Sequence, residues 1–154
     1  MDKATLYPLV TEAIRRAEVL DEIGAPGARL AYLDVSLLEE RIASLFPPSN
    51  AEGAIARRGA ISAAIAAHEF QRAKELVAKF ISESGASVSI CADLTKLGTE
   101  AASFIKLEER SMAARYPRVS AKYGIDELLR FSKQFYDQVF RAYGGQICRL
   151  YPRR

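Results

Sequence analysis

Apolar side chains recur at three- and four-residue steps along most of this chain, which is the period of an amphipathic α-helix. The first run predicts a helix over about residues 6–23, where Pro8 suits the first turn because a missing backbone N–H costs nothing there. The sequence GAPG at residues 24–27 ends this helix. Its apolar stripe consists of Leu6, Val10, Ala13, Ala17 and Leu20.

The second run predicts a helix over about residues 28–46. Pro47 and Pro48 end it, because a proline forces the preceding residue out of the helical region. Its large apolar residues are spaced to form one buried face, and the charged residues between them would point to solvent. The expected core face consists of Leu30, Leu33, Leu37, Leu38, Ile42 and Leu45, and the expected outward residues are Glu39, Glu40 and Arg41.

A third and longest helix is predicted over about residues 51–83. Ser49 and Glu52 have the spacing of a capping box at its start, and Gly85 is a suitable cap at its end. Gly59 would weaken or kink the helix, at a cost of about 1 kcal/mol relative to alanine. One apolar row is unbroken and contains Ala66, Phe70, Ala73, Val77 and Ile81. The neighbouring row has two polar members and contains Ile61, Ile65, His68, Arg72, Leu76 and Phe80.

Two further helices complete the pattern. A fourth is predicted over about residues 87–115, with Gly98 as a place where it would divide; the alternation at its start would also suit a strand, but a lone strand has no partner. The fifth, over about residues 126–143, starts with acidic residues and ends at a glycine pair, as the helix dipole favours. Its wide apolar face consists of Leu128, Leu129, Phe131, Phe135, Tyr136, Val139, Phe140 and Tyr143.

These segments predict an all-α fold, a single-domain bundle of about five helices over residues 1–154, with the third and fifth helices at its centre. Residues 145–154 would form a basic C-terminal tail that docks in part on this body. A chain of 154 residues with 49% hydrophobic and 27% charged residues can bury a core without disulfides or metals.

The same composition bears on location. No run approaches the roughly 18 apolar residues that a membrane span requires, and the start MDKATLYPLV lacks the pattern of an export signal. Cys91 and Cys148 are isolated thiols in no metal-ligand spacing. We therefore expect a cytoplasmic protein without membrane contact and with free cysteines, although a pairing between the two thiols would also fit the sequence.

His68 is the only histidine of the chain and the first candidate for catalysis or metal binding. The positions three and four residues away hold no further ligand, and no motif typical of a nucleophilic triad is present. We therefore expect no catalytic residue, no metal and no cofactor, and we interpret His68 as a residue at the margin of a helix–helix seam. The alternative is that His68 and Arg72, one helical turn apart, line a pocket for an anionic ligand.

Residues 93–110 resemble a helix-turn-helix DNA-binding unit, with Gly98 at the turn and Phe104 and Leu107 as packed positions of the recognition helix. The acidic side chains of this segment would be repelled by DNA phosphates. They are Glu100, Glu108 and Glu109. The chain also departs from the pattern four and five residues before the glycine, at Leu94 and Asp93.

Positive charge is concentrated in the last third of the chain. Residues 1–105 carry 11 basic and 14 acidic side chains, a net charge of −3, whereas residues 106–154 carry 11 basic and 5 acidic ones, a net charge of +6. Guanidinium groups pair with phosphates, and neighbouring tyrosines can stack on unpaired bases. The candidate nucleic-acid-binding residues are Arg110, Arg115, Arg118, Lys122, Arg149, Arg153 and Arg154.

Three functions follow from these observations. The leading hypothesis is a non-enzymatic cytoplasmic interaction or regulatory protein that self-associates, as a homodimer, or binds a protein partner, because its apolar helix surface exceeds what one small bundle covers. The second is a nucleic-acid-binding protein that uses the basic last third. The third is a ligand-binding or enzymatic bundle with a pocket near His68.

Overall fold

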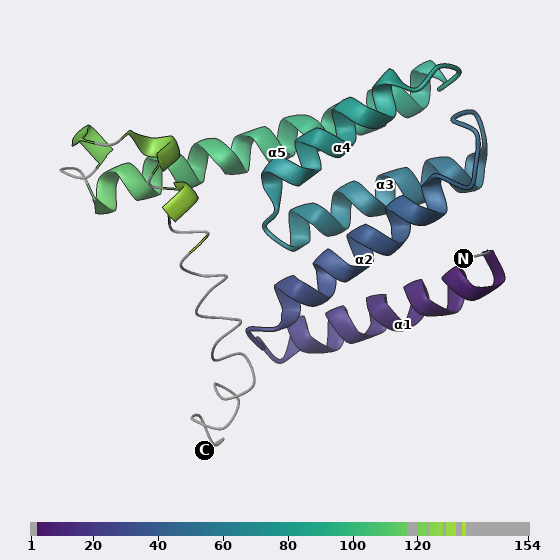
Figure 1. The fold of residues 1–154 in the computed structure, drawn as a ribbon, viewed down its shortest axis with the longest axis horizontal. Coiled ribbons are helices and arrows are strands. Elements are labelled where there is room, and N and C mark those ends of the chain that lie inside the picture. The colour runs from purple at the N-terminus through teal and green to yellow at the C-terminus, as the bar shows by residue number, and fades with distance from the viewer. Residues whose placement is uncertain (1–2, 117–119, 123, 128, 132–133, 135–154) are drawn as a thin grey trace. The chain divides into compact units, whose positions relative to one another are not determined.

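The computed structural model describes residues 3–116, 120–122, 124–127, 129–131 and 134, which contain helices and turns but no strand (Figure 1). The all-α prediction is therefore confirmed. The five long helices are α1 (Lys3–Glu22), α2 (Ala28–Ala43), α3 (Ala51–Ala66), α4 (Phe70–Ser82) and α5 (Val88–Arg115).

The chain divides into two compact units, Met1–Ile105 and Lys106–Arg154. The division falls where the net charge of the sequence changes sign. The prediction of a single domain over the whole chain stays a prediction. Most of the expected fifth helix, and all of the tail at residues 145–154, lie outside the described residues. In the second unit, Arg130 forms an ion pair with Glu127 at 2.5 Å, and Phe131 is exposed.

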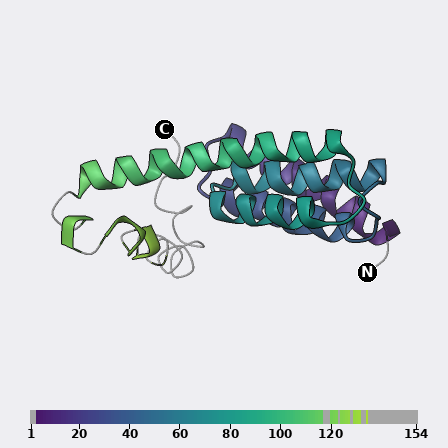
Figure 2. The same ribbon diagram turned by 90° about the horizontal axis from the view of Figure 1, so that it is seen from above.

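In the first unit, successive helices form antiparallel pairs in which α1 packs on α2, α2 on α3, and α3 on α4 (Figure 1). Seen from above, α1 to α4 run side by side along a common direction (Figure 2). The core draws on all of these helices and on the start of α5. Its larger members are Leu6, Val10, Ile42, Phe46, Ile61, Leu76, Val77, Phe80 and Leu94.

Helix α1 buries the stripe that its sequence predicts, with Leu6, Val10, Ala13 and Ala17 buried. However, it begins at Lys3, about a turn earlier than expected, so Pro8 lies inside the helix and not in its first turn. The ammonium group of Lys3 lies 3.6 Å from the centre of the Phe46 ring, and this cation–π contact holds the added turn against the end of α2.

The predicted core face of α2 is wrong for three of its six residues, whereas Ile42 is buried and Leu38 packs against the core. Leu30, Leu37 and Leu45 are 46%, 42% and 39% exposed, and Leu33 and Leu38 are half-buried. The buried side consists mainly of small residues, which are Ala28, Ala31, Val35, Ser36, Ile42 and Ala43. Small side chains let the neighbouring backbones come close, as the hydrogen bond of 2.8 Å from Ser36 Oγ to the carbonyl oxygen of Ala60 shows. Close backbone approach therefore selected the small-residue side of α2, and left Leu30 and Leu37 exposed.

Glu39, which was expected to point outward, is half-buried between α2 and α3. A β-carbon on Gly59 would lie 3.0 Å from its carboxyl carbon, so the glycine makes room for this side chain. Burial raises the pKa of Glu39. Gly59 does not interrupt α3, in contrast to the predicted kink.

The predicted third helix is two helices, α3 and α4, separated at His68. His68 has a φ of 59°, in the left-handed region. Its N–H donates to the carbonyl oxygen of Ile65, and the N–H of Glu69 donates to that of Ala64, both at 2.9 Å. This is the Schellman pattern that ends many helices, normally with glycine at the left-handed position. Because histidine stands there in place of glycine, the sequence did not reveal the helix end.

The same motif ends α1 with the expected residue. Gly24 has a φ of 62°, and the N–H groups of Gly24 and Ala25 donate to the carbonyl oxygens of Asp21 and Leu20, both at 2.8 Å. The two turns therefore form a matched pair with glycine in one and histidine in the other.

Replacing His68 with glycine is expected to raise the free energy of unfolding by about 0.5–1 kcal/mol, because the left-handed conformation strains a residue that has a β-carbon. Urea unfolding followed by circular dichroism measures the change. The matched variant Gly24→His should lower the free energy of unfolding by a similar amount. A loss of stability in His68→Gly would show instead that the contacts of the imidazole outweigh the strain.

Hydrogen bonds at the starts of α3 and α5 test two further predictions. The cap of α3 is Asn50, whose side-chain oxygen accepts from the N–H of Gly53 at 3.0 Å, and the predicted capping box with Ser49 is wrong. Ser87 caps α5, since its Oγ accepts from the N–H of Ile90 at 3.3 Å, which confirms the predicted helix start.

The resemblance to a helix-turn-helix unit is not confirmed, because α5 continues without a break through Gly98. A β-carbon at this position would lie 3.1 Å from Cγ1 of Val77, so Gly98 lets α5 approach α4 closely. Leu107, expected to be packed, is exposed, while the Phe104 ring stacks on Phe70 with a centroid distance of 5.0 Å.

Candidate functional site

The outward side of α2 and the turn after it carry a line of five exposed side chains. The first four lie within α2 at a spacing of three or four residues, and so along one side of the helix over about 16 Å at 1.5 Å per residue, and the fifth follows in the turn after Ala43. We call this line the outer row. It consists of Leu30, Asp34, Leu37, Arg41 and Leu45.

Paired charges border the outer row on the side of α1. Arg16 of α1 donates from Nη2 to Oδ2 of Asp34 at 2.5 Å. Leu9 and Arg16 are seven residues apart and so share one line along α1, and Ile23 follows in the turn directly after the helix. Leu9 and Ile23 are 44% and 59% exposed, so α1 adds apolar surface at the border that Arg16 forms with the outer row.

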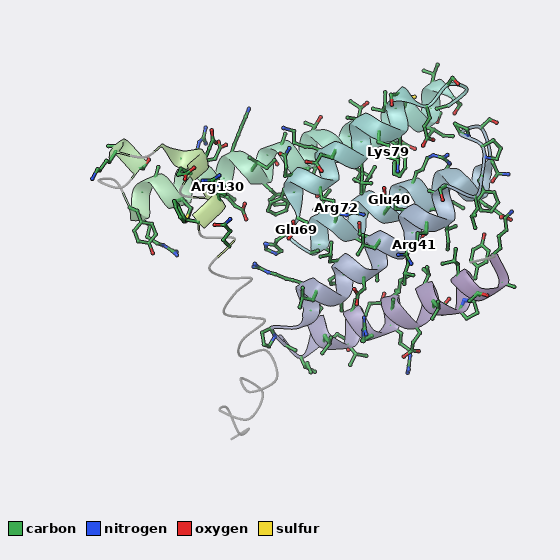
Figure 3. The ribbon with its side chains drawn as sticks, viewed as in Figure 1. Glu40, Arg41, Glu69, Arg72, Lys79 and Arg130 are labelled. Carbon is green, nitrogen blue, oxygen red and sulfur yellow. The ribbon has the colours of Figure 1, made fainter. Side chains whose placement is uncertain are left out.

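A second group of paired charges lies between α2 and α4 (Figure 3). Glu40 accepts from Arg72 Nη2 at 2.5 Å and from Lys79 Nζ at 2.8 Å. The Nε of Arg72 also donates to the buried Oγ of Ser36 at 3.2 Å. The leucines of the outer row therefore lie between two sets of paired charges, an arrangement of apolar centre and polar rim that is typical of protein interfaces.

Opposing effects set the pKa of Glu40. Burial would raise it, but the hydrogen bonds and positive charges of Lys79 and Arg72 outweigh burial, and the pKa is lowered. A lowered carboxyl pKa means that the network stabilises the fold above the unfolded-state pKa of Glu40 and loses this contribution as the pH falls through the folded-state value. The guanidinium of Arg72 is thus engaged by Glu40 and Ser36.

His68 and Arg72, the two residues of the predicted ligand pocket, lie in different environments. His68 is exposed in the turn before α4, with its ring 5.5 Å from the ring of Phe70, whereas Arg72 points toward α2. Partial shielding from water lowers the pKa of His68, the charge of Arg29 lowers it further, and the charge of Asp21 opposes the shift. An anion pocket formed by His68 and Arg72 stays a prediction.

Arg57, which the sequence pattern did not single out, is the buried charge of α3, with its side chain 3% exposed. It donates from Nε and Nη2 to Oε2 of Glu83, at 2.8 and 2.7 Å, and from Nη2 to the carbonyl oxygen of Phe46 at 3.1 Å. Its Nη1 has no hydrogen-bond partner in the part of the chain that the structure describes, and lies against Gly53, where even a β-carbon would come within 2.6 Å. This packing leaves no room for a ligand, so Arg57 joins α3 to the ends of α2 and α4.

The candidate nucleic-acid-binding residues are only partly placed. Arg110 and Arg115 are exposed on the last part of α5, and Lys122 is exposed in the second unit. The remaining four, which are Arg118, Arg149, Arg153 and Arg154, lie outside the described residues. A single basic surface formed by all seven stays a prediction.

Within the described part of the chain, no group of three or more His, Cys, Asp or Glu side chains is placed to hold a metal ion. None of the described helices combines the length and hydrophobicity needed to cross a membrane. Comparison of the chain with protein-family models, with curated proteins and with solved structures finds no match.

Proposed function

We propose that this protein is a non-enzymatic cytoplasmic interaction protein that self-associates through the outer row of α2. The observation that carries the proposal is that α2 packs its small-residue side inward and presents Leu30, Leu37 and Leu45 to solvent. Single exposed leucines are common on protein surfaces. Three leucines in one line, with a polar rim on either side, have the anatomy of an interface centre.

The energetics support this use of the face. Burying a leucine side chain completely contributes about 1.5–3 kcal/mol, so covering the exposed part of each of these three contributes about 1 kcal/mol. The bordering charges are already held in place by their ion pairs, as Glu40 is by Arg72 and Lys79. Less side-chain entropy is lost on binding when the rim is ordered beforehand.

Replacing Leu37 with glutamate, at the centre of the outer row, is expected to raise the dissociation constant for self-association at least about tenfold, because it places a charge in the apolar contact. Sedimentation velocity at micromolar concentration measures this against the monomer mass of 17.0 kDa. The control is Ile55→Glu on α3, where the side chain is 71% exposed outside the outer row.

The control variant should associate as the wild type does, and circular dichroism should show both variants folded. A wild-type protein that stays monomeric at every concentration would remove self-association from the proposal. Equal loss of association in both variants would show that the outer row is not the contact.

A further inference from the structure

The order of residue types along the outer row is nearly the same from either end. Relative to Leu37, leucines lie seven residues before and eight after, Asp34 lies three before, and Arg41 lies four after. When two such rows run antiparallel with Leu37 facing Leu37, Leu30 faces Leu45 and Asp34 faces Arg41. The offset of one residue corresponds to about 1.5 Å, which side chains can absorb.

We propose that the occupant of the outer row is a second copy of this chain, packed antiparallel about a two-fold axis at Leu37. The inference rests on the proposed function, since it uses the same face. In a two-fold interface the same patch meets itself, so that residue i contacts residue j and j contacts i. The order Leu–Asp–Leu–Arg–Leu meets this condition.

Charge selects the antiparallel direction. In a parallel pairing, Asp34 would face Asp34 and Arg41 would face Arg41, and like charges opposite one another are repulsive. In the antiparallel pairing, each dimer gains two Asp34–Arg41 pairs between the copies. The antiparallel pairing therefore replaces the two like-charge repulsions of the parallel pairing with two attractions.

Arg41 is available for such a pair. Its guanidinium, labelled in Figure 3, has no hydrogen-bond or ion-pair partner among the described residues, whereas the cations that border the row, Arg16, Arg72 and Lys79, are paired with Asp34 or Glu40. Asp34 can accept from Arg16 and from a second guanidinium at once, because a carboxylate has about four acceptor sites.

The contact extends beyond α2. Specific interfaces bury about 1,200–2,000 Å² in total, more than a single helix row supplies. Leu9 lies on the same line of α1 as Arg16, which borders the row through its bond to Asp34, and Ile23 lies in the turn directly after α1. These exposed apolar side chains enlarge the face toward the size that a stable dimer needs.

A charge-exchange experiment tests the pairing. Asp34→Arg and Arg41→Asp each place like charges opposite one another in both pairs, so each variant alone is expected to dissociate about tenfold more readily than the wild type. An equimolar mixture of the two restores opposite charges, and should form a heterodimer. The double variant Asp34→Arg/Arg41→Asp should regain the homodimer. Arg15→Gln, which removes an exposed ion pair with Glu12 that takes no part in the proposed contact, should leave the dimer in place.

A cysteine placed on the axis gives a second measurement. In a Cys91→Ser/Cys148→Ser background, Leu37→Cys should form a disulfide-linked dimer in the presence of oxidised glutathione, since a residue on a two-fold axis faces its own copy. Ile55→Cys, on α3, should form no disulfide-linked dimer under the same conditions, although it associates as the wild type does.

The outcomes separate this inference from the proposed function. If Leu37→Glu dissociates the protein but the mixture of Asp34→Arg and Arg41→Asp does not reassociate, the outer row binds in another way, and the two-fold pairing is overturned. If the wild type is monomeric throughout, both are overturned. Loss of association in each single variant and its return in the double variant, together with crosslinking at position 37 alone, supports the antiparallel two-fold pairing.

Discussion

Truncating Glu83 to alanine is expected to lower the free energy of unfolding by about 3 kcal/mol, because removing one partner of a buried ion pair leaves the other charge uncompensated. The Arg57 side chain is 3% exposed, and two of its nitrogens donate to Glu83. Without Glu83, the carbonyl oxygen of Phe46 is the remaining acceptor for this buried cation. Urea unfolding followed by circular dichroism measures the loss.

A change at Arg57, the other partner of the ion pair, provides the control. Arg57→Met is expected to cost less than Glu83→Ala, because methionine fills much of the space and the Glu83 side chain, which is 27% exposed, can be rehydrated. The double variant should cost clearly less than the sum of the two single changes, since the unpaired buried charge is then absent. Additive losses would show that the two side chains are not coupled.

Replacing Gly53 with alanine is expected to lower the free energy of unfolding by about 2 kcal/mol, although alanine favours a helix by about 1 kcal/mol over glycine. The added β-carbon would lie 2.6 Å from Nη1 of Arg57 and 2.7 Å from Cβ of Phe46. Both neighbours are buried and fixed, so the backbones of α3 and of the segment after α2 must separate. Thermal and urea unfolding both report the change.

Gly59 offers the matched control on the same helix. An added β-carbon there would lie 3.0 Å from the carboxyl end of Glu39, which is the end of a flexible side chain and can move aside. Gly59→Ala should therefore leave stability unchanged or raise it by up to about 1 kcal/mol. Equal losses in both variants would show that general strain in α3, and not the contact with Arg57 and Phe46, sets the cost.

The expected losses of stability in Glu83→Ala and Gly53→Ala also concern the outer row. Phe46 directly follows Leu45, the last residue of the row, and the bond from Arg57 to the carbonyl oxygen of Phe46 fixes this end of the helix. Glu83→Ala and Gly53→Ala should therefore make the protein unfold more readily. They leave unchanged the charges of Asp34 and Arg41, which select the antiparallel pairing.

The sequence by itself determined that the described chain is helical and where most helices lie. The spacing of Leu6, Val10, Ala13 and Ala17 predicts the buried stripe of α1, and Ser87 marks the start of α5. These features depend on contacts within a few residues, and helical periodicity and capping report such contacts directly.

Only the tertiary structure decided which side of α2 faces inward. Helical periodicity gives α2 both a leucine side and a small-residue side, and the choice depends on how closely α1 and α3 can approach. The left-handed turn at His68 and the burial of Arg57 depend likewise on packing between segments distant in the sequence. The spacing of residues along one helix gives no information on the distance to the next helix. The exposed leucines that carry the proposed function can therefore be identified only when the helices are packed together.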